Sequence, residues 1–148
     1  MIKFDAVYYE PDSLTYPLGK QLKEQYAALP WILIESHNSI KEMQEKPNSE
    51  FAQMKRNLII GTRKTHKYVE YHKVSDYLVP STSSGCTAMC LYCYLVCNYN
   101  KCAYLRLFVN REQMLDRILK RARTSEQPLT FEIGSNSDLV LENTITGN

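Results

Sequence analysis

The sequence predicts an α/β protein, with an N-terminal α/β module over residues 1–75 and the first βαβ unit of a partial barrel over residues 76–148. Short apolar runs typical of strands alternate with segments whose apolar residues recur at helical spacing. The second module also has the order strand, cysteine-rich loop, helix and strand, and such units build parallel sheets. Because a complete eight-stranded barrel takes about 250 residues, we expect a truncated chain, the N-terminal portion of a larger protein.

The first module is expected to contain one helix and two strands. Apolar residues at helical spacing predict a helix over residues 14–29, which Pro30 ends. The apolar run 31–34 predicts a buried strand, and the run 57–60 predicts a second strand. The polar residues 36–50 are expected to form a connecting loop.

The second module is expected to add two strands around one amphipathic helix. Residues 76–80 predict a strand, and the small residues 81–85 predict a flexible loop that leads to the first cysteine. Asn110 is expected to cap the following helix, with Gln113 as its capping-box partner. Residues 129–133 predict the last strand.

Composition and charge exclude some classes of protein and leave others open. The chain is 44% hydrophobic and 23% charged, with a net charge of +2, which is typical of a soluble globular domain. No run of about 18 apolar residues occurs, so we expect no membrane-spanning helix. The first residues also lack the pattern of a secretory signal, so we expect a cytoplasmic protein. Basic residues are concentrated at 55–73 and 101–123, which leaves a nucleic-acid partner open.

The five cysteines all lie within residues 86–102. An odd number of cysteines packed this closely is a poor disulfide framework. In a reducing compartment such clusters usually bind metal or perform redox chemistry. We therefore expect the functional site in this segment.

The spacing of the first three cysteines indicates an iron–sulfur cluster with one open iron. Thiolates are soft ligands that suit zinc or iron–sulfur clusters. Structural zinc sites usually take two separated ligand pairs, and the bacterial ferredoxin run has a different spacing. The pattern here is Cys86-x3-Cys90-x2-Cys93. Three such cysteines can hold three irons of a [4Fe–4S] cluster and leave the fourth iron without a protein ligand.

This motif, with Tyr92 before its third cysteine, resembles the radical S-adenosylmethionine signature. Further segments resemble the spore photoproduct lyase family, and together they extend over nearly the whole chain: residues 9–11, 16–20, 61–64, 90–95, 104–110, 131–132 and 137–138. The resemblance covers only the N-terminal part of that family's length. It implies that the partial barrel is a TIM-type radical SAM barrel.

The resemblance also implies an activity, cofactors and partners. Family members use a [4Fe–4S] cluster to cleave S-adenosyl-L-methionine to methionine and a 5′-deoxyadenosyl radical. The radical takes a hydrogen from C6 of the thymine dimer in UV-damaged DNA, the spore photoproduct 5-thyminyl-5,6-dihydrothymine, which then reverts to two thymines. An external electron donor, a monomeric state, no membrane partner, and DNA contact mostly through a missing C-terminal part are implied as well.

The same resemblance suggests roles for individual residues. Cys86, Cys90 and Cys93 would be the cluster ligands, with inert or zinc-binding cysteines as the alternative. Tyr92 would lie near the adenine of the cofactor, unless it only packs around the loop. Tyr94 would relay the hydrogen atom.

The loop after the last strand holds two further candidates. By resemblance, Ser137 and Asp138 would contact the amino-acid part of S-adenosyl-L-methionine. A hydroxyl and a carboxylate are sensible partners for an ammonium group. The alternative is a turn or helix cap, for which Ser, Asn and Asp are all favoured.

One position departs from the family pattern. Better-known members have a cysteine at the position that matches Ser135, and that cysteine returns the hydrogen atom. A serine O–H bond is too strong to replace it, so we expect another thiol, Cys97 rather than Cys102, to take this role. The departure leaves open a changed substrate within the family. A zinc-binding or thiol-switch module is an alternative of another class.

Overall fold

The computed structural model describes residues 2–79, 81–95, 104–134 and 136–147. Its elements, in chain order, are β1 (Ala6–Tyr9), η1 (Pro11–Thr15), α1 (Pro17–Gln25), β2 (Trp31–Leu33), α2 (Lys41–Gln44), η2 (Asn48–Glu50), α3 (Phe51–Met54), β3 (Asn57–Gly61), β4 (Val69–Glu70), β5 (Tyr77–Leu78), β6 (Ser83–Ser84), β7 (Arg106–Phe108), α5 (Arg111–Arg123), β8 (Phe131–Glu132) and α6 (Leu139–Thr146). The mixture of helices with mainly parallel strands confirms the predicted α/β class.

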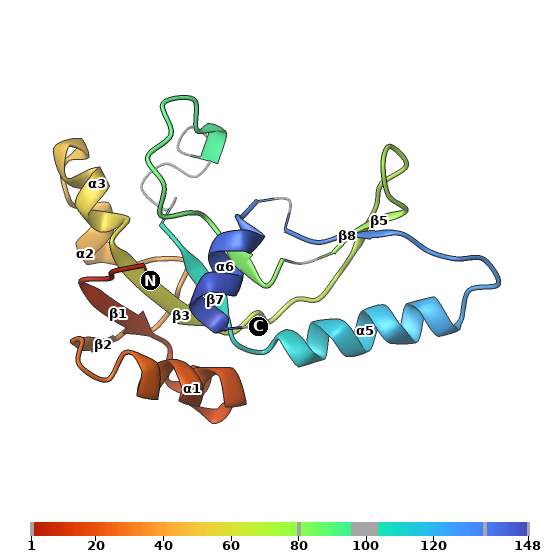
Figure 1. Cartoon of the computed structure of the whole chain (residues 1–148), viewed down its shortest axis with the longest axis horizontal. Helices are drawn as coiled ribbons and strands as arrows, with labels where there is room; N and C mark the ends of the chain where they lie inside the picture. Colours follow the sequence, from red (N-terminus) through yellow and green to blue (C-terminus); the bar gives the residue numbers. More distant parts are fainter. Residues whose placement is uncertain (1, 80, 96–103, 135, 148) are drawn as a thin grey trace.

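The larger sheet of the described residues has five strands in the order β2-β1-β3-β7-β6, of which Figure 1 labels the first four. β1, β2, β3 and β7 are parallel, and β6 joins the edge antiparallel to β7. The sheet therefore contains strands from both sides of residue 75. The division into two modules at that residue stays a prediction.

Alternate residues of β3 face two hydrophobic cores, because successive side chains of a strand point to opposite faces. Leu58 and Ile60 pack in a core with Leu22 of α1 and Ile145 of α6. Ile59 lies in the second core, to which α2 and α3 contribute Met43 and Met54. Helices thus cover both faces of the sheet, as parallel strands require.

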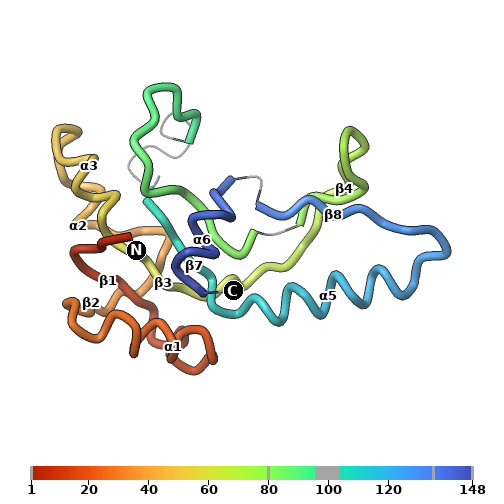
Figure 2. Tube along the Cα trace, viewed as in Figure 1, coloured from red at the N-terminus to blue at the C-terminus, as the bar shows by residue number. Residues whose placement is uncertain are grey.

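A second, three-stranded sheet has the order β4-β5-β8. β5 and β8 are parallel, with Tyr77 opposite Phe131, so the two predicted strands of the βαβ unit do lie side by side. The amphipathic helix α5 runs beside this sheet, as Figure 2 shows, and Arg121 Nη2 donates a hydrogen bond to the Tyr77 hydroxyl at 2.7 Å.

Two segments that we expected to be loops have regular structure. Residues 36–50 contain α2 and η2, because burial of Met43 in the core fixes a helical turn within a polar stretch. Residues 81–85 contain β6, whose two serines are buried against β7. The predicted helix over 14–29 is shorter than expected, since α1 ends at Gln25.

Two further expectations are corrected by packing. β2 is an edge strand with partly exposed residues, not a buried strand. α5 begins after Asn110 as predicted, but the Asn110 side chain accepts no capping hydrogen bond from the backbone of that helix. The Asn110 amide does donate to the side chain of Gln113, the predicted partner, at 3.0 Å. Its oxygen instead accepts from the Arg63 backbone N–H at 2.8 Å, and its amide donates to the Arg63 carbonyl at 2.8 Å. This contact with Arg63 is favoured over a capping hydrogen bond because it satisfies both the N–H and the carbonyl of the Arg63 backbone.

Candidate functional site

The three candidate ligands lie on a loop that leaves the sheet at the end of β6. Cys86 and Cys93 are half-buried, Cys90 is exposed, and all three thiols are free. The Ala88 N–H donates to Cys86 Sγ at 3.3 Å, and the Cys93 N–H donates to the Cys90 carbonyl at 3.2 Å. The loop thus presents three soft donor atoms within eight residues.

The chemistry of this donor set fits an iron–sulfur cluster, since free thiols are its usual protein ligands. Among the residues that the structure describes, no three His, Cys, Asp or Glu side chains are arranged to hold a metal ion. The three thiols share a loop without converging on one point.

The loop after β8 lies against the start of the cysteine loop. The Gly85 N–H donates to the Asn136 carbonyl at 2.9 Å, and Gly85 forms an isolated parallel bridge with Ser137. The Tyr94 hydroxyl donates to Asn136 Oδ1 at 3.4 Å. The structure therefore brings Tyr94 and the candidate cofactor residue Ser137 to the cysteine loop.

Ser137 and Asp138 differ in how their side chains are used. Ser137 Oγ is buried and has no hydrogen-bond partner within the described part of the chain. Asp138 caps α6, because its Oδ1 accepts from the backbone N–H groups of Val140 at 3.0 Å and Leu141 at 3.1 Å. Both capping bonds end on Oδ1, so Oδ2 is not needed for the cap. An unused hydroxyl and a carboxylate oxygen at this loop fit the ammonium group of an amino acid.

The other candidates are either exposed or outside the described residues. Tyr92 is 97% exposed and Tyr94 is 53% exposed. Cys97, the expected hydrogen donor, lies outside the described residues, as do Cys102 and Ser135.

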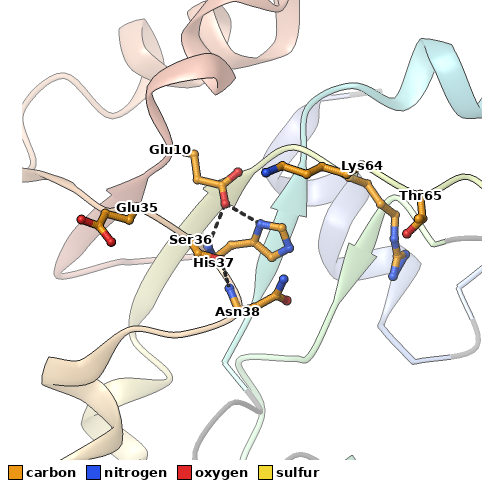
Figure 3. Close-up of a pocket in the computed structure, with 8 residues that line it drawn as sticks. Glu10, Glu35, Ser36, His37, Asn38, Lys64 and Thr65 are labelled. Atoms are coloured by element: carbon orange, nitrogen blue, oxygen red, sulfur yellow. Dashed lines mark hydrogen bonds and ion pairs between the residues drawn. The ribbon is translucent and has the colours of Figure 1, made fainter.

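A polar pocket of about 290 Å³ lies at the carboxyl ends of β1, β2 and β3, and the sequence analysis did not predict it. Figure 3 shows the Glu10 carboxylate facing the His37 ring, with Lys64 beside them. Glu10 Oε1 accepts from the His37 backbone N–H at 2.8 Å and lies 2.7 Å from His37 Nδ1. Glu10 Oε2 accepts from the Thr62 N–H at 2.9 Å. The carboxylate therefore builds the pocket by joining three strand ends.

The pKa values of this pair follow from burial and hydrogen bonding. Burial acts to raise the pKa of Glu10, but hydrogen bonds from the His37 and Thr62 backbones, together with the His37 charge, lower it below its ordinary value. Burial lowers the pKa of His37, and the cations Arg106 and Arg63 add to this against the opposing effect of Glu10. Near neutral pH the pair is thus a carboxylate bonded to a neutral imidazole.

This pocket was missed because its members are far apart in the sequence. Glu10 and His37 are separated by 27 residues, and neither belongs to a local metal or catalytic motif. Glu10 and residues 61–64 do belong to segments that resemble a known family. That shared resemblance is the one sequence signal that could have suggested that they form a common site.

The chain is similar over nearly its whole length to one family of proteins. A sequence model of the family described as spore photoproduct lyase matches residues 2–148. The spore photoproduct lyases of Bacillus subtilis (strain 168) and Geobacillus sp. (strain Y412MC61) are 33% and 30% identical to it over 138 residues, covering 90% of this chain and 40% of each relative. The chain therefore spans about 40% of the length of these curated relatives.

Solved structures of the same enzyme share the fold. A spore photoproduct lyase complexed with dinucleoside spore photoproduct matches with a TM-score of 0.86 and 29% identity, over 98% of this chain and 44% of that one. A spore photoproduct lyase mutant with bound AdoMet and dinucleoside spore photoproduct also matches with a TM-score of 0.86. The identity is 28%, and the match covers 97% of this chain and 43% of that one. None of these names points to a different substrate or to a zinc-binding module. No helix within the described ranges is long and apolar enough to cross a membrane.

Proposed function

The chain belongs to the spore photoproduct lyase family, and we propose that it carries the cofactor-binding part of a radical S-adenosylmethionine lyase that reverts the spore photoproduct in UV-damaged DNA to two thymines. The family match over residues 2–148 supports this assignment. The observation that carries it is the pairing of Gly85 with Ser137, which joins the three-cysteine loop to the loop expected to bind the cofactor.

Cys86, Cys90 and Cys93 are the proposed ligands of a [4Fe–4S] cluster. When bound, the cluster and S-adenosyl-L-methionine supply the one-electron chemistry that yields the 5′-deoxyadenosyl radical. The protein would supply three thiolates on one loop, one fewer than the cluster has irons. The exposed position of Cys90 and the partial exposure of Cys86 and Cys93 make all three thiols accessible to incoming iron.

Ser137 and Asp138 are proposed to orient the amino-acid part of the cofactor. The unpartnered Ser137 hydroxyl would accept from its ammonium group, and Asp138 Oδ2 would add a charge-assisted bond. Tyr92 is proposed to contact the adenine, and Tyr94 to relay the hydrogen atom. The hydrogen bond of Tyr94 to Asn136 holds its hydroxyl at the same loop and supports this role.

Cys97 is proposed to return the hydrogen atom to the product in place of the cysteine absent at position 135. Replacement by alanine would leave a substrate radical without a thiol donor. In a form of the protein that turns over, Cys97→Ala should therefore give trapped radical adducts. Clean release of two thymines from Cys97→Ala would contradict the role.

The proposed partners are UV-damaged DNA and an external electron donor. Because the chain spans about 40% of its curated relatives, we expect most of the DNA contact to come from family segments outside it. DNA binding by these 148 residues should therefore be weak, and little turnover of the DNA lesion should occur. A monomer in the cytoplasm is the proposed state, consistent with free thiols in a reducing compartment.

Reductive cleavage of the cofactor tests this function without requiring DNA. The chain is reconstituted anaerobically with iron and sulfide, then incubated with dithionite and S-adenosyl-L-methionine. We expect 5′-deoxyadenosine and methionine from the unmodified chain and none from Cys93→Ala. A reconstituted, folded chain that leaves the cofactor intact would contradict the proposal.

A further inference from the structure

Lys55 is a buried cation that donates to a backbone carbonyl. The residue is 1% exposed and lies between α3 and β3. Its Nζ donates to the Ala88 carbonyl at 2.6 Å and lies 5.5 Å from the centre of the Phe51 ring. Within the described ranges no ion pair joins it to a carboxylate. Lysine is almost never fully buried unless it is paired, so this position calls for a reason.

The acceptor of this hydrogen bond lies inside the three-cysteine motif. Ala88 is midway between Cys86 and Cys90, and its own N–H donates to Cys86 Sγ at 3.3 Å. The backbone of Ala88 is therefore held on one side by Lys55 and holds the first thiol on the other. This contact also crosses 33 residues of sequence, from the end of α3 to the cysteine loop.

We infer that Lys55 is a positioning residue for the cysteine loop: its ammonium group fixes Ala88, whose own N–H donates to Cys86 Sγ, and its charge would act on the thiolates that would hold the cluster. The second half of this inference rests on the proposed function. Hydrogen bonds to the sulfurs and nearby charges set the reduction potential of an iron–sulfur cluster. Reduction adds one negative charge, so a nearby cation stabilises the reduced form.

Three variants separate this role from ordinary packing. Lys55→Met removes the charge and the donor but keeps the length of the side chain. Lys55→Arg keeps both. Lys41→Met, at an exposed position on the neighbouring helix α2, is the matched control. Burial of a charge without a counter-charge costs free energy, so removing this ammonium group while keeping the length of the side chain should leave Lys55→Met folded.

Amide hydrogen exchange on the metal-free chain tests the positioning role. Lys55→Met should speed exchange over residues 86–93 while its free energy of unfolding stays level or rises. Lys55→Arg should restore slow exchange, and Lys41→Met should match the unmodified chain. Equal exchange over this loop in Lys55→Met and the unmodified chain would overturn the inference, whether or not the chain holds a cluster.

The midpoint potential of the reconstituted cluster tests the electrostatic role. Lys55→Met should move it to a more negative value, and Lys55→Arg should bring it back. Metal affinity of the loop should fall about 10-fold or more in Lys55→Met, as is typical when a group that supports metal ligands is removed. A potential that stays unchanged in Lys55→Met would overturn the electrostatic half. An unmodified chain that takes up no cluster would instead contradict the proposed function, and the exchange measurement would still decide the positioning role.

Discussion

Gly85 and Ser137 form a backbone bridge that joins the first residue before the cysteine motif to the loop after β8. A second contact supports the bridge, since the Gly85 N–H donates to the Asn136 carbonyl at 2.9 Å. Two segments about 50 residues apart thus share one site. The fold itself thus joins the loop of the proposed cluster ligands to the loop of the proposed cofactor residues.

Loss of any one of the three motif cysteines should abolish the cluster. Cys86→Ala, Cys90→Ala and Cys93→Ala each leave two thiolates, too few to retain a [4Fe–4S] cluster with one open iron. Iron and sulfide analysis after anaerobic reconstitution checks this. Cys102→Ala is the matched control and should retain the full iron content, and equal loss in that variant would argue against the ligand assignment.

Substitution of Asp138 should separate its capping role from its cofactor role. Asp138→Asn keeps an oxygen that can accept the two capping bonds, whereas Asp138→Ala removes the cap of α6 at a cost of about 1 kcal/mol in unfolding free energy. Both variants lose the charge proposed to bind the ammonium group. We expect weaker S-adenosyl-L-methionine binding in both, measured by calorimetry on reconstituted protein. Unchanged binding in Asp138→Asn would leave the residue with a capping role alone.

Acid should destabilise the fold in two steps through the pair Glu10 and His37. Because the pKa of His37 is lowered in the folded state, the unfolded chain binds a proton first, and stability falls as the pH drops below about 6.5. The pKa of Glu10 is also lowered, so its contribution is present above the ordinary carboxyl pKa and is lost below about 4.5.

Urea unfolding at a series of pH values checks this dependence. His37→Gln should flatten the change between pH 7 and pH 5, because the buried imidazole is gone. His72→Gln, at an exposed position, is the control and should show the same dependence of unfolding free energy on pH as the unmodified chain. A pH dependence that survives in His37→Gln would assign the first step to another group, of which His66, with its pKa also lowered by burial and by Arg117, is the candidate.

Local patterns in the sequence predicted the elements that depend on local chemistry. The apolar run 57–60 is confirmed because its residues pack on both faces of the strand. The amphipathic helix is confirmed as α5, but only Met114 of its apolar face is buried, and Leu115 and Leu119 are exposed. β7 was missed, since Arg106 interrupts its apolar run. That arginine is only 8% exposed and donates to Ser84 Oγ at 3.0 Å, a partner supplied by another strand.

In the candidate site, too, the residues of a local motif could be predicted from the sequence, whereas contacts between distant segments could not. Spacing alone indicated Cys86, Cys90 and Cys93, because a cluster motif is a local pattern. The bond from Lys55 to Ala88 and the bonds around Glu10 depend on segments that only the folded sheet brings together. No periodicity or spacing in the sequence encodes such contacts.

Electron paramagnetic resonance of the reconstituted, reduced chain, with and without S-adenosyl-L-methionine, tests the central claim most directly. We predict a [4Fe–4S] signal that changes when the cofactor is added, because three cysteine ligands would leave one iron open to it. Cys86→Ala should give no such signal. A folded chain that holds only zinc, or a cluster whose signal is indifferent to the cofactor, would contradict the account.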